Sequence, residues 1–568
     1  MVEANATNDG KARKQGRYSS LDEVPQALKD KLRRHITSID GDTFAITGLP
    51  PELAGGALAR YSRAPTSMKL TIINEFLDES GEPSQEKGSQ LMDRVLNAFG
   101  DESVGELEGA HVGLEAVSQL LTKTIEDRRI GGSPIEQSTR YVRYDQKDAQ
   151  GRWRYLRPRE ILDAGLVEEY EAANDRAFAV YSELVGKLSE YFRGQLPEDR
   201  FEIEVSRGGA RTKAHRSELR GEAEERAFRI AYNFTIRCAA LDVGRCVLPS
   251  STLTQVGIFG NGRFFTNLIT AMKSGELLEE QVRGVELEDE LKKVIPTYIK
   301  RNRNDPELAE RNKRMRELAA RVLPKAAPAE EWVSLLEFGE YIDGIVASAL
   351  FPYTALSMNQ ISDAVRKMPQ QQKEEVLDAY IGDRKSRRDR TGRGLESGYP
   401  LLFELVGGFA EYRDLERHRM LTQQRQLLGC DLGFIMPPEV IEVGMGKGVT
   451  EVVKAMEALN VKIRRAGLLI ASQYATLFNH RIRFMLGMNL REFQHLSELR
   501  TQPAGHFSYR SMVMEMSRQL IARYPWARGA LGFVDYSDPG NKIARAKEQS
   551  RIAGKNLLRN ISSETDLE

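Results

Sequence analysis

The sequence has few cysteines, no net charge and no long apolar run. Its three cysteines, Cys238, Cys246 and Cys430, show no Cys-x-x-Cys spacing, which argues against a disulfide framework and favours a reducing compartment. Its 82 basic and 82 acidic residues cancel, so composition gives no sign of a nucleic-acid partner. No apolar run reaches the roughly 18 residues that a membrane-spanning helix needs. We therefore expect a cytoplasmic protein with no membrane and no nucleic-acid partner.

Two common kinds of site are also missing. The seven histidines include no His-Glu-x-x-His pair, so no metal site is predicted. The segment 444–450 is rich in glycine but lacks the Gly-x-x-x-x-Gly-Lys-Ser/Thr spacing of a phosphate-binding P-loop. The basic segment 384–390 has no interleaved aromatic residues, which favours a solvated loop over a nucleic-acid contact.

What is present begins with length, because 568 residues are too many for one hydrophobic core. A charged run over 304–321 is followed by Pro324-Lys325-Ala326-Ala327-Pro328, which cannot continue a helix and predicts a linker. We expect five segments along the chain: a polar N-terminal tail over 1–40, a first domain over 41–300, a charged helix and linker over 301–332, a second domain over 333–537, and a C-terminal tail over 538–568.

The two predicted domains resemble each other weakly. Residues 111–117 alternate like a strand and run into an amphipathic helix predicted to end at Arg129, and residues 401–406 run into one predicted to end at Arg419. Later, residues 260–264 are echoed by 487–492, each opening an apolar run of helical period. Residues 59–68 likewise resemble 347–358, and long helices are predicted over 167–193 and 456–477. The same order of features in both halves predicts a tandem duplication.

Arginines gather where the predicted helix of the second half ends. Arg417, His418 and Arg419 follow Arg413, which lies one turn back on the face of Arg417. Guanidinium groups bind phosphate or carboxylate through two parallel hydrogen bonds, so this cluster suits a phosphate. The alternative is a surface salt-bridge face, on which neighbouring carboxylates neutralise the arginines: Glu411, Asp414 and Glu416.

The first half has a complementary motif. Glu136, Ser138, Arg140 and Tyr141 follow a loop that contains two glycines. Short hydroxyl groups and an arginine on such a loop suit an exposed nucleotide, and an ordinary strand start is the alternative.

A third motif occurs in both halves. Asn261 precedes Arg263 by two residues, and Asn489 precedes Arg491 in the same way. An amide can read the edge of a heterocycle, whereas helix capping is the alternative for an asparagine before a helix. Arg500 follows nine residues after Arg491 on the same predicted helix, and its counterpart in the first half is Met272.

Together these motifs resemble the flavin-dependent thymidylate synthases (the ThyX family), in a form with two tandem repeats. The family is marked by Arg-His-Arg, then seven or eight residues, then Ser, within a longer pattern that ends in Glu-x-Ser-x-Arg-Tyr. The second half keeps Arg417-His418-Arg419, whereas the first has Asp127-Arg128-Arg129 but keeps Glu136 to Tyr141. The family's Arg-x-Val-Leu-Pro segment matches residues 245–249, and His111 matches a family histidine near the flavin.

The resemblance implies a mixed α/β (α+β) fold of two ThyX-like repeats, each a small sheet flanked by long helices. Because family sites lie between subunits of a homotetramer, it also implies a homodimer of this chain that acts as a pseudo-tetramer with two competent sites. The implied reaction converts dUMP to dTMP, with FAD as cofactor, methylenetetrahydrofolate as carbon donor and NADPH as reductant.

The resemblance also assigns residues to these ligands. Arg500 and Ser138 are the implied catalytic residues, because a positioned guanidinium stabilises the negative charge that builds on a carbonyl of the ring. The implied dUMP-binding residues are Glu136, Ser138, Arg140, Arg245, Arg417 and Arg500. The implied FAD-binding residues are His111, Arg417, His418, Arg419, Asn489, Arg491, Asn261 and Arg263.

The sequence departs from the family at several of these positions. Asp414 stands where the family has a glutamine that contacts the pyrimidine, Arg425 replaces the loop carboxylate in the second half, and Thr139 replaces a small residue. Two other functions therefore stay open. One is a catalytically inactive ThyX-like protein that binds nucleotide or flavin in a structural or regulatory role. The other is a related flavoenzyme that modifies a different pyrimidine nucleotide.

Overall fold

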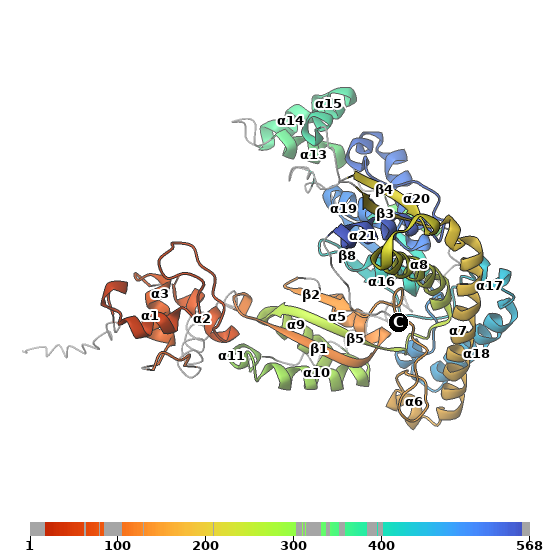
Figure 1. Ribbon diagram of the computed structural model, residues 1–568, viewed down its shortest axis with the longest axis horizontal. Helices are drawn as coiled ribbons and strands as arrows, with labels where there is room; N and C mark the ends of the chain where they lie inside the picture. Colours follow the sequence, from red (N-terminus) through yellow and green to blue (C-terminus); the bar gives the residue numbers. More distant parts are fainter. Residues whose placement is uncertain are drawn as a thin grey trace, which may run out of the picture. The chain divides into compact units, whose positions relative to one another are not determined.

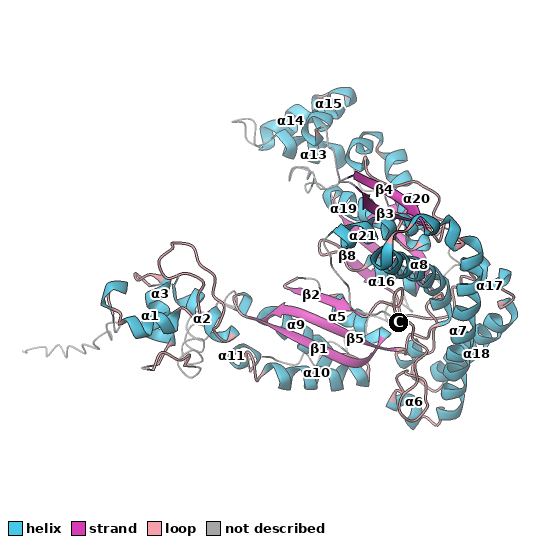
Figure 2. Ribbon diagram, viewed as in Figure 1, coloured by secondary structure: helices cyan, strands magenta, loops and turns pink. Residues whose placement is uncertain are grey.

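The computed structural model has a mixed α/β fold of small sheets flanked by helices (Figures 1 and 2). It describes residues 18–61, 64–78, 80–84, 105–128, 130–207, 210–300, 302, 309, 313, 331–336, 341–350, 358–382, 395 and 401–558. Arg129, the predicted linker 324–328 and the basic segment 384–390 lie outside the described residues. Two compact units make up the chain, and each is described by itself.

The first unit comprises Met1–Gly113, Ile130–Ile135 and Gly257–Leu318. Its N-terminal part is helical, with α1 (Gln26–Leu32), α2 (Pro51–Tyr61), α3 (Met68–Thr71) and a π-helix (Ile72–Phe76) around a core that includes Leu32, Leu53 and Phe76. Its later helices are α9 (Gly262–Lys273), α10 (Leu278–Leu291) and α11 (Pro296–Ile299), and α9 packs against both of the others.

The second unit comprises Leu114–Arg129, Glu136–Val256 and Ala319–Glu568. Its longest helix, α7 (Val167–Gln195), matches the helix predicted there and packs against α8 (Gly221–Gly244). In the sequence between these two helices, β3 (Glu202–Arg207) and β4 (Ala210–His215) form an antiparallel hairpin. The other helices are α5 (Gln119–Glu126), α6 (Arg159–Asp163), α13 (Tyr341–Leu350), α14 (Met358–Lys367), α15 (Gln370–Ile381), α16 (Phe409–Leu415), α17 (Pro438–Glu442), α18 (Gly446–Arg465), α19 (Leu490–Arg500), α20 (Phe507–Arg523) and α21 (Ala546–Leu558).

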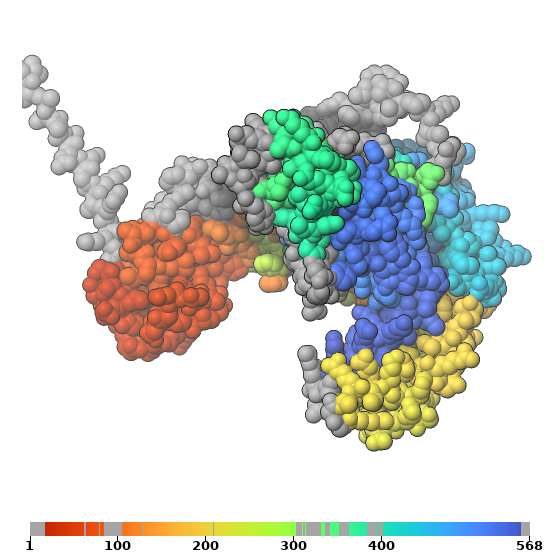
Figure 3. Space-filling model, turned by 90° about the horizontal axis from the view of Figure 1, so that it is seen from above, coloured from red at the N-terminus to blue at the C-terminus, as the bar shows by residue number. Residues whose placement is uncertain are grey.

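The C-terminal helix is part of this second unit. It packs against α8 and β3, and Figure 3 shows the hairpin and α8, in yellow, lying against the blue C-terminal part of the chain. The segment expected as a C-terminal tail therefore contains an ordered helix over Ala546–Leu558.

Two sheets with the same strand order establish the tandem repeat. In the first, β1 (Gly109–Ser118), β5 (Leu253–Asn261) and β2 (Gly132–Glu136) lie in the order β1-β5-β2. In the second, β7 (Leu401–Gly408), β9 (Arg481–Met488) and β8 (Thr422–Arg425) lie in the order β7-β9-β8, with β6 (Val333–Leu336) added beside β7. A helix directly follows the first two strands of each order: α5 follows β1 and α9 follows β5 in one repeat, and α16 follows β7 and α19 follows β9 in the other.

Equivalent hydrogen bonds hold the two repeats in the same local form. When Asn261 is set against Asn489, Thr252 falls on His480. The amide of Gln119 donates to the carbonyl of Thr252 at 3.0 Å, and the amide of Phe409 donates to the carbonyl of His480 at 3.2 Å. Thr252 and His480 each also form an isolated antiparallel bridge with a residue earlier in the sequence. The two residues that they pair with occupy equivalent positions in the two repeats.

The repeats meet about a local two-fold axis within the second unit. Pro249 pairs in an antiparallel bridge with Leu477. In the alignment just given, Leu477 is the counterpart of Pro249, so the bridge joins equivalent positions of the two repeats. On either side, the amide of Ser250 donates to Thr476 and the amide of Phe478 donates to Leu248, both at 2.9 Å. Exchanging the repeats turns each of these bonds into the other, as in an isologous dimer interface. The counterpart helices α7 and α18 also pack against each other.

Three predicted helix ends are wrong. The helix predicted to end at Arg129 is α5, which ends at Glu126. The helix predicted to end at Arg419 is α16, which ends at Leu415, because the amide of Glu416 makes the last helical bond, to Tyr412, and the chain then turns. The helix predicted over 456–477 is α18, which runs from Gly446 to Arg465. Gly444 and Gly467 flank it with φ values of 74° and 83°, a conformation that glycine adopts without strain and that ends helices.

Candidate functional site

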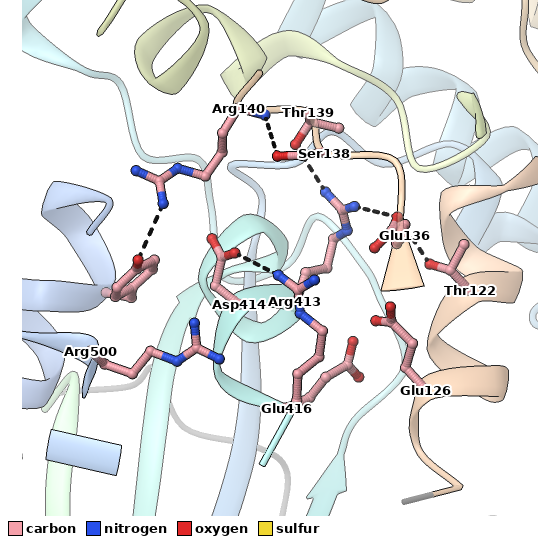
Figure 4. Close-up of polar contacts among 12 residues, drawn as sticks. Thr122, Glu126, Glu136, Ser138, Thr139, Arg140, Arg413, Asp414, Glu416 and Arg500 are labelled. Atoms are coloured by element: carbon pink, nitrogen blue, oxygen red, sulfur yellow. Dashed lines mark hydrogen bonds and ion pairs between the residues drawn. The ribbon is translucent and has the colours of Figure 1, made fainter. Parts of the chain in front are cut away.

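The loop after β2 in the first repeat and the end of α16 in the second repeat meet in the second unit. Figure 4 shows their side chains pointing toward one another. Arg413 Nη2 donates to Glu136 Oε1 at 2.5 Å. Arg413 and Arg245 each lie 3.4 Å from the hydroxyl oxygen of Thr139. The segment 136–140 and the second-repeat arginines therefore converge within a single chain.

Asp414 links two of the arginines that the sequence singled out. Its carboxylate accepts from Arg245 at 3.0 Å and from Arg417 at 3.2 Å. Burial alone would raise the pKa of Asp414, but Arg245, Arg140 and Arg417 outweigh burial and hold that pKa well below its usual range. Asp414 is therefore an ionised, acceptor-only group at the position where the family has a glutamine.

The predicted surface salt-bridge face exists only in part. Asp414 does neutralise Arg417, but it is buried. Glu411 and Glu416 contact other groups: Glu411 accepts from the hydroxyl of Ser508, and Glu416 pairs with Lys123 at 2.6 Å.

On the other side of the cluster, Tyr509 lies between two predicted substrate residues. Arg140 donates through Nε and Nη2 to both carboxylate oxygens of Asp242, at 2.7 and 2.8 Å, and through Nη1 to the hydroxyl of Tyr509 at 3.2 Å. The guanidinium carbon of Arg500 lies 5.8 Å from the centre of the Tyr509 ring. In the same loop, the hydroxyl oxygen of Ser138 accepts from the amide of Arg140 at 3.2 Å.

His418 connects Arg500 to a carboxylate. Its Nδ1 lies 3.0 Å from Glu492 Oε1, and its Nε2 lies 2.9 Å from Arg500 Nε. Burial and the neighbouring Arg500 lower the pKa of His418 well below its usual value, so the ring is neutral. One tautomer satisfies both contacts: Nδ1–H donates to Glu492, and the lone pair of Nε2 accepts from Arg500. His418 thereby fixes the direction of the Arg500 guanidinium.

A buried lysine joins the same network. Lys123, on α5, is 1% exposed and pairs with Glu126 at 2.5 Å, Glu416 at 2.6 Å and Glu136 at 3.4 Å. Burial alone would lower the pKa of Lys123, but these carboxylates outweigh it and raise the pKa, so the ammonium group stays charged.

Sequence reasoning missed Lys123, Asp242 and Tyr509. For Lys123 a signal was available, because setting Glu126 against Glu416 places Lys123 on Arg413. Equivalent cations of the two repeats thus both contact Glu136. Asp242 and Tyr509 lie in helical segments that gave no such signal.

Glu136 lies between these cations. Burial alone would raise the pKa of Glu136, but Arg413, Lys123 and Arg417 outweigh it and lower that pKa. Glu136 is therefore a buried, ionised acceptor held by side chains from both repeats.

Both predicted asparagines cap helices. Asn261 accepts from the amide of Phe264 at 2.8 Å and Asn489 from the amide of Glu492 at 3.0 Å, so their recurrence has a structural cause. Asn261, Arg263 and His111 belong to the first unit. There Arg263 pairs with Glu106 at 2.8 Å, and the His111 ring lies 4.7 Å from that of Phe259.

Three arginines of the second unit that the family resemblance assigns to FAD differ in exposure. Arg417 and Arg419 are exposed and Arg491 is partly exposed. No group of three or more metal-ligating side chains occurs among the residues that the structure describes. In the same part of the chain, no helix combines the length and apolar character needed to cross a membrane.

Comparisons with known proteins agree with the motifs. The family model described as "Thymidylate synthase complementing protein" matches residues 57–325 and 402–526. A UPF0159 protein of Chlamydia muridarum is 34% identical over 551 residues, which covers 92% of this chain and 97% of that protein. A UPF0159 protein of Thermoplasma acidophilum is 30% identical over 498 residues, covering 85% of this chain and 95% of that protein.

A comparison with solved structures gives a weaker likeness. It finds a UMP/dUMP methylase from Streptomyces cacaoi bound to 5-Br dUMP, at 14% identity and a TM-score of 0.29. The match covers 35% of this chain and 94% of that one.

Proposed function

Because the chain belongs to the thymidylate synthase complementing protein family, we propose that it methylates dUMP to dTMP. FAD would be the cofactor, methylenetetrahydrofolate the carbon donor and NADPH the reductant. The observation that carries the proposal is the meeting of Glu136 and Arg140 with Arg413 and Arg500 inside one chain. The first repeat lacks an arginine at the position of Arg500, and the second lacks the carboxylate of Glu136, so one site would need both repeats.

The nucleotide would lie among the arginines that meet at Tyr509 and Thr139. Arg140, Arg245 and Arg417 offer donors to the phosphate and the ring oxygens, and the buried Glu136 offers an ionised acceptor. Ser138 adds a hydroxyl group on the loop that carries Arg140. Together with Arg500, these groups are the dUMP-binding set that the family resemblance implied.

Arg500 would stabilise the charge that develops on the uracil ring. Attack at the ring places negative charge on a carbonyl oxygen, and a donor that is already oriented stabilises this charge without reorganising. The neutral His418 holds the Nε of Arg500 and leaves its two terminal nitrogens to other acceptors. Arg500 would therefore act on the ring while His418 positions it.

The exposed cations near this cluster fit an anionic cofactor. Arg417, Arg419 and Arg491 present guanidinium groups on the accessible side, and Asn489 places an amide at the start of α19. Such donors suit the pyrophosphate of FAD. When bound, FAD would supply the hydride chemistry, while the protein binds and orients the two ligands.

We also propose that two chains form a dimer equivalent to the family tetramer. The local two-fold axis at Pro249 and Leu477 already reproduces one interface between repeats inside the chain. A dimer would then carry two sites of the kind described.

One observation favours a second candidate, a nucleotide-binding protein that does not methylate. Asp414 occupies donors of both Arg245 and Arg417, and as an ionised carboxylate it offers the ring only acceptors where a glutamine offers both donors and acceptors. A site with this altered ring-reading group could bind a pyrimidine nucleotide without turnover, or accept a different one.

The test is carried out on the purified full-length protein. The proposal predicts a flavin absorbance band, NADPH oxidation stimulated by dUMP, and formation of dTMP. Arg500→Ala and Ser138→Ala should lose dTMP formation, whereas Arg481→Ala, an exposed arginine on β9, should keep it. Complementation of a thymidine-requiring cell by the wild-type protein, but not by Arg417→Ala, gives an independent readout. Binding of dUMP without any dTMP would favour the second candidate.

A further inference from the structure

The C-terminal segment reaches the candidate site through Arg545. This residue lies beyond the family match, which ends at residue 526, and directly before α21. Its side chain is almost fully buried, with the residue 6% exposed. Its Nη2 donates to the carbonyl of Ala504 at 2.6 Å, and its Nη1 lies 3.7 Å from the sulfur of Cys238.

Arg545 converges with Arg140. Arg140 Nη2 also donates to the carbonyl of Ala504, at 3.2 Å, so two guanidinium groups share one acceptor. Asp242 pairs with Arg140 through both oxygens, but no ion pair between Arg545 and a carboxylate is found among the described residues. Two buried guanidinium groups thus meet at a neutral acceptor, with Asp242 paired directly to Arg140 and Asp414 also close enough to act on the charge of Arg140.

Arg545 also packs on the turn that carries Ser138. The amide of Val142 donates to the carbonyl of Ser138 at 3.1 Å, which closes this turn. The ring of Tyr141, on the turn, lies 4.9 Å from the Arg545 guanidinium and 5.5 Å from the ring of Phe234. Arg140 is part of this turn and Arg545 packs against it, so both guanidinium groups lie beside the segment that bears the predicted substrate-binding serine.

Like charges this close in a poorly solvated site repel each other unless an anion lies beside them. A phosphate monoester suits the arrangement, because it carries about two negative charges near neutral pH and accepts paired hydrogen bonds from guanidinium groups.

We propose that Arg545 binds the 5′-phosphate of the pyrimidine nucleotide, together with Arg140 and Ser138. The C-terminal segment is then part of the nucleotide site and makes it selective for nucleotides over nucleosides. This inference rests on the proposed function for the identity of the ligand.

The test measures binding of dUMP, deoxyuridine and inorganic phosphate to the full-length chain by calorimetry. The variants are Arg545→Ala and Arg545→Gln, the second of which keeps most of the side-chain volume and one donor group. Arg551→Ala is the matched control. Arg551 lies on α21, but it is exposed and makes just a long ion pair with Glu204, at 3.9 Å.

Loss of a hydrogen bond to a charged group predicts that both Arg545 variants weaken dUMP and inorganic phosphate binding by about tenfold or more. Binding of deoxyuridine should stay within about twofold of wild type, because the nucleoside lacks the group in question. Arg551→Ala should bind all three ligands as the wild type does.

Three results would overturn the inference. They are unchanged dUMP affinity in both Arg545 variants, an equal loss of dUMP and deoxyuridine affinity in both, and a wild-type protein that binds neither dUMP nor phosphate. A selective loss of dUMP binding in a protein that makes no dTMP would support this inference while the proposed methylation fails. The two proposals can therefore fail separately.

Discussion

Arg413 of the second repeat donates a hydrogen bond to Glu136 of the first, across 277 positions of the chain. Both side chains are buried. Because an isolated buried charge is strongly unfavourable, each of these residues depends on the other. The contact therefore joins the two repeats and sets the charge of Glu136.

A double-mutant cycle tests this dependence. Arg413→Met removes the 2.5 Å ion pair of Glu136 and leaves Lys123 as its remaining direct ion pair among the described residues. We expect this change to lower the free energy of unfolding by about 3 kcal/mol or more. Combined with Glu136→Gln it should cost less than the sum of the single changes, since the neutral side chain no longer needs a cation. Urea denaturation measures each value. Arg464→Met removes an exposed partner of Asp431 and should cost less than about 1 kcal/mol. Strict additivity in the cycle would contradict the coupling.

Lys123 should act on substrate binding through Glu136. Lys123→Met removes one of the cations that lower the pKa of Glu136, so that pKa should rise toward the value favoured by burial. Loss of dUMP affinity on acidification should therefore begin at a higher pH than in the wild type. Lys123→Arg keeps the charge and should therefore keep the wild-type pH profile of dUMP affinity. Lys462→Met removes an exposed ion pair with Glu169 and should also leave this pH profile unchanged. Identical pH profiles in the wild type and Lys123→Met would exclude this role.

The first unit should lose stability as the pH rises. Burial, with a smaller contribution from Glu52, raises the pKa of Glu108 to about 8, and neither of its buried carboxylate oxygens has a hydrogen-bond partner among the described residues. Since the folded-state pKa lies above the unfolded one, the unfolded chain ionises first. The free energy of unfolding should then fall between about pH 4.5 and pH 8, by at most about 1.4 kcal/mol per pH unit.

Amide hydrogen exchange of α2 and α11 reports this local stability. Glu108→Gln should abolish the pH-dependent part of the protection, after correction for the intrinsic exchange rate. Glu106→Gln, which changes an exposed carboxylate paired with Arg263, should leave it in place. A pH dependence that survives in Glu108→Gln would assign it to another group.

The two asparagine caps separate structure from cofactor binding. Asn261→Ala and Asn489→Ala should each cost about 1 kcal/mol, because both lose a capping hydrogen bond. Under the proposed function only Asn489→Ala should also lower the bound FAD. Asn489→Ser keeps a capping oxygen but loses the amide, so it should keep the stability and still lose FAD. Equal FAD content in all three variants would restrict Asn489 to capping.

The repeat and its motifs were predictable because they are local. Strand alternation before α5 and α16, and an asparagine before α9 and α19, depend on neighbouring residues, so the sequence shows them in both halves. The helix ends were less predictable, because α16 stops where Glu416 turns toward Lys123 of the other repeat. Because Lys123 belongs to the first repeat, the sequence of the second repeat alone does not indicate where α16 ends.

The sequence by itself determined the duplicated architecture, the family and the residue types available for a site. Only the tertiary structure decided which of those charges meet. It set Glu136 between Arg413 and Lys123, Asp414 between Arg245 and Arg417, and Arg545 beside Arg140. The physical reason is that local patterns arise from short-range backbone and packing preferences, whereas buried charges are stabilised by partners that folding brings together from distant parts of the chain.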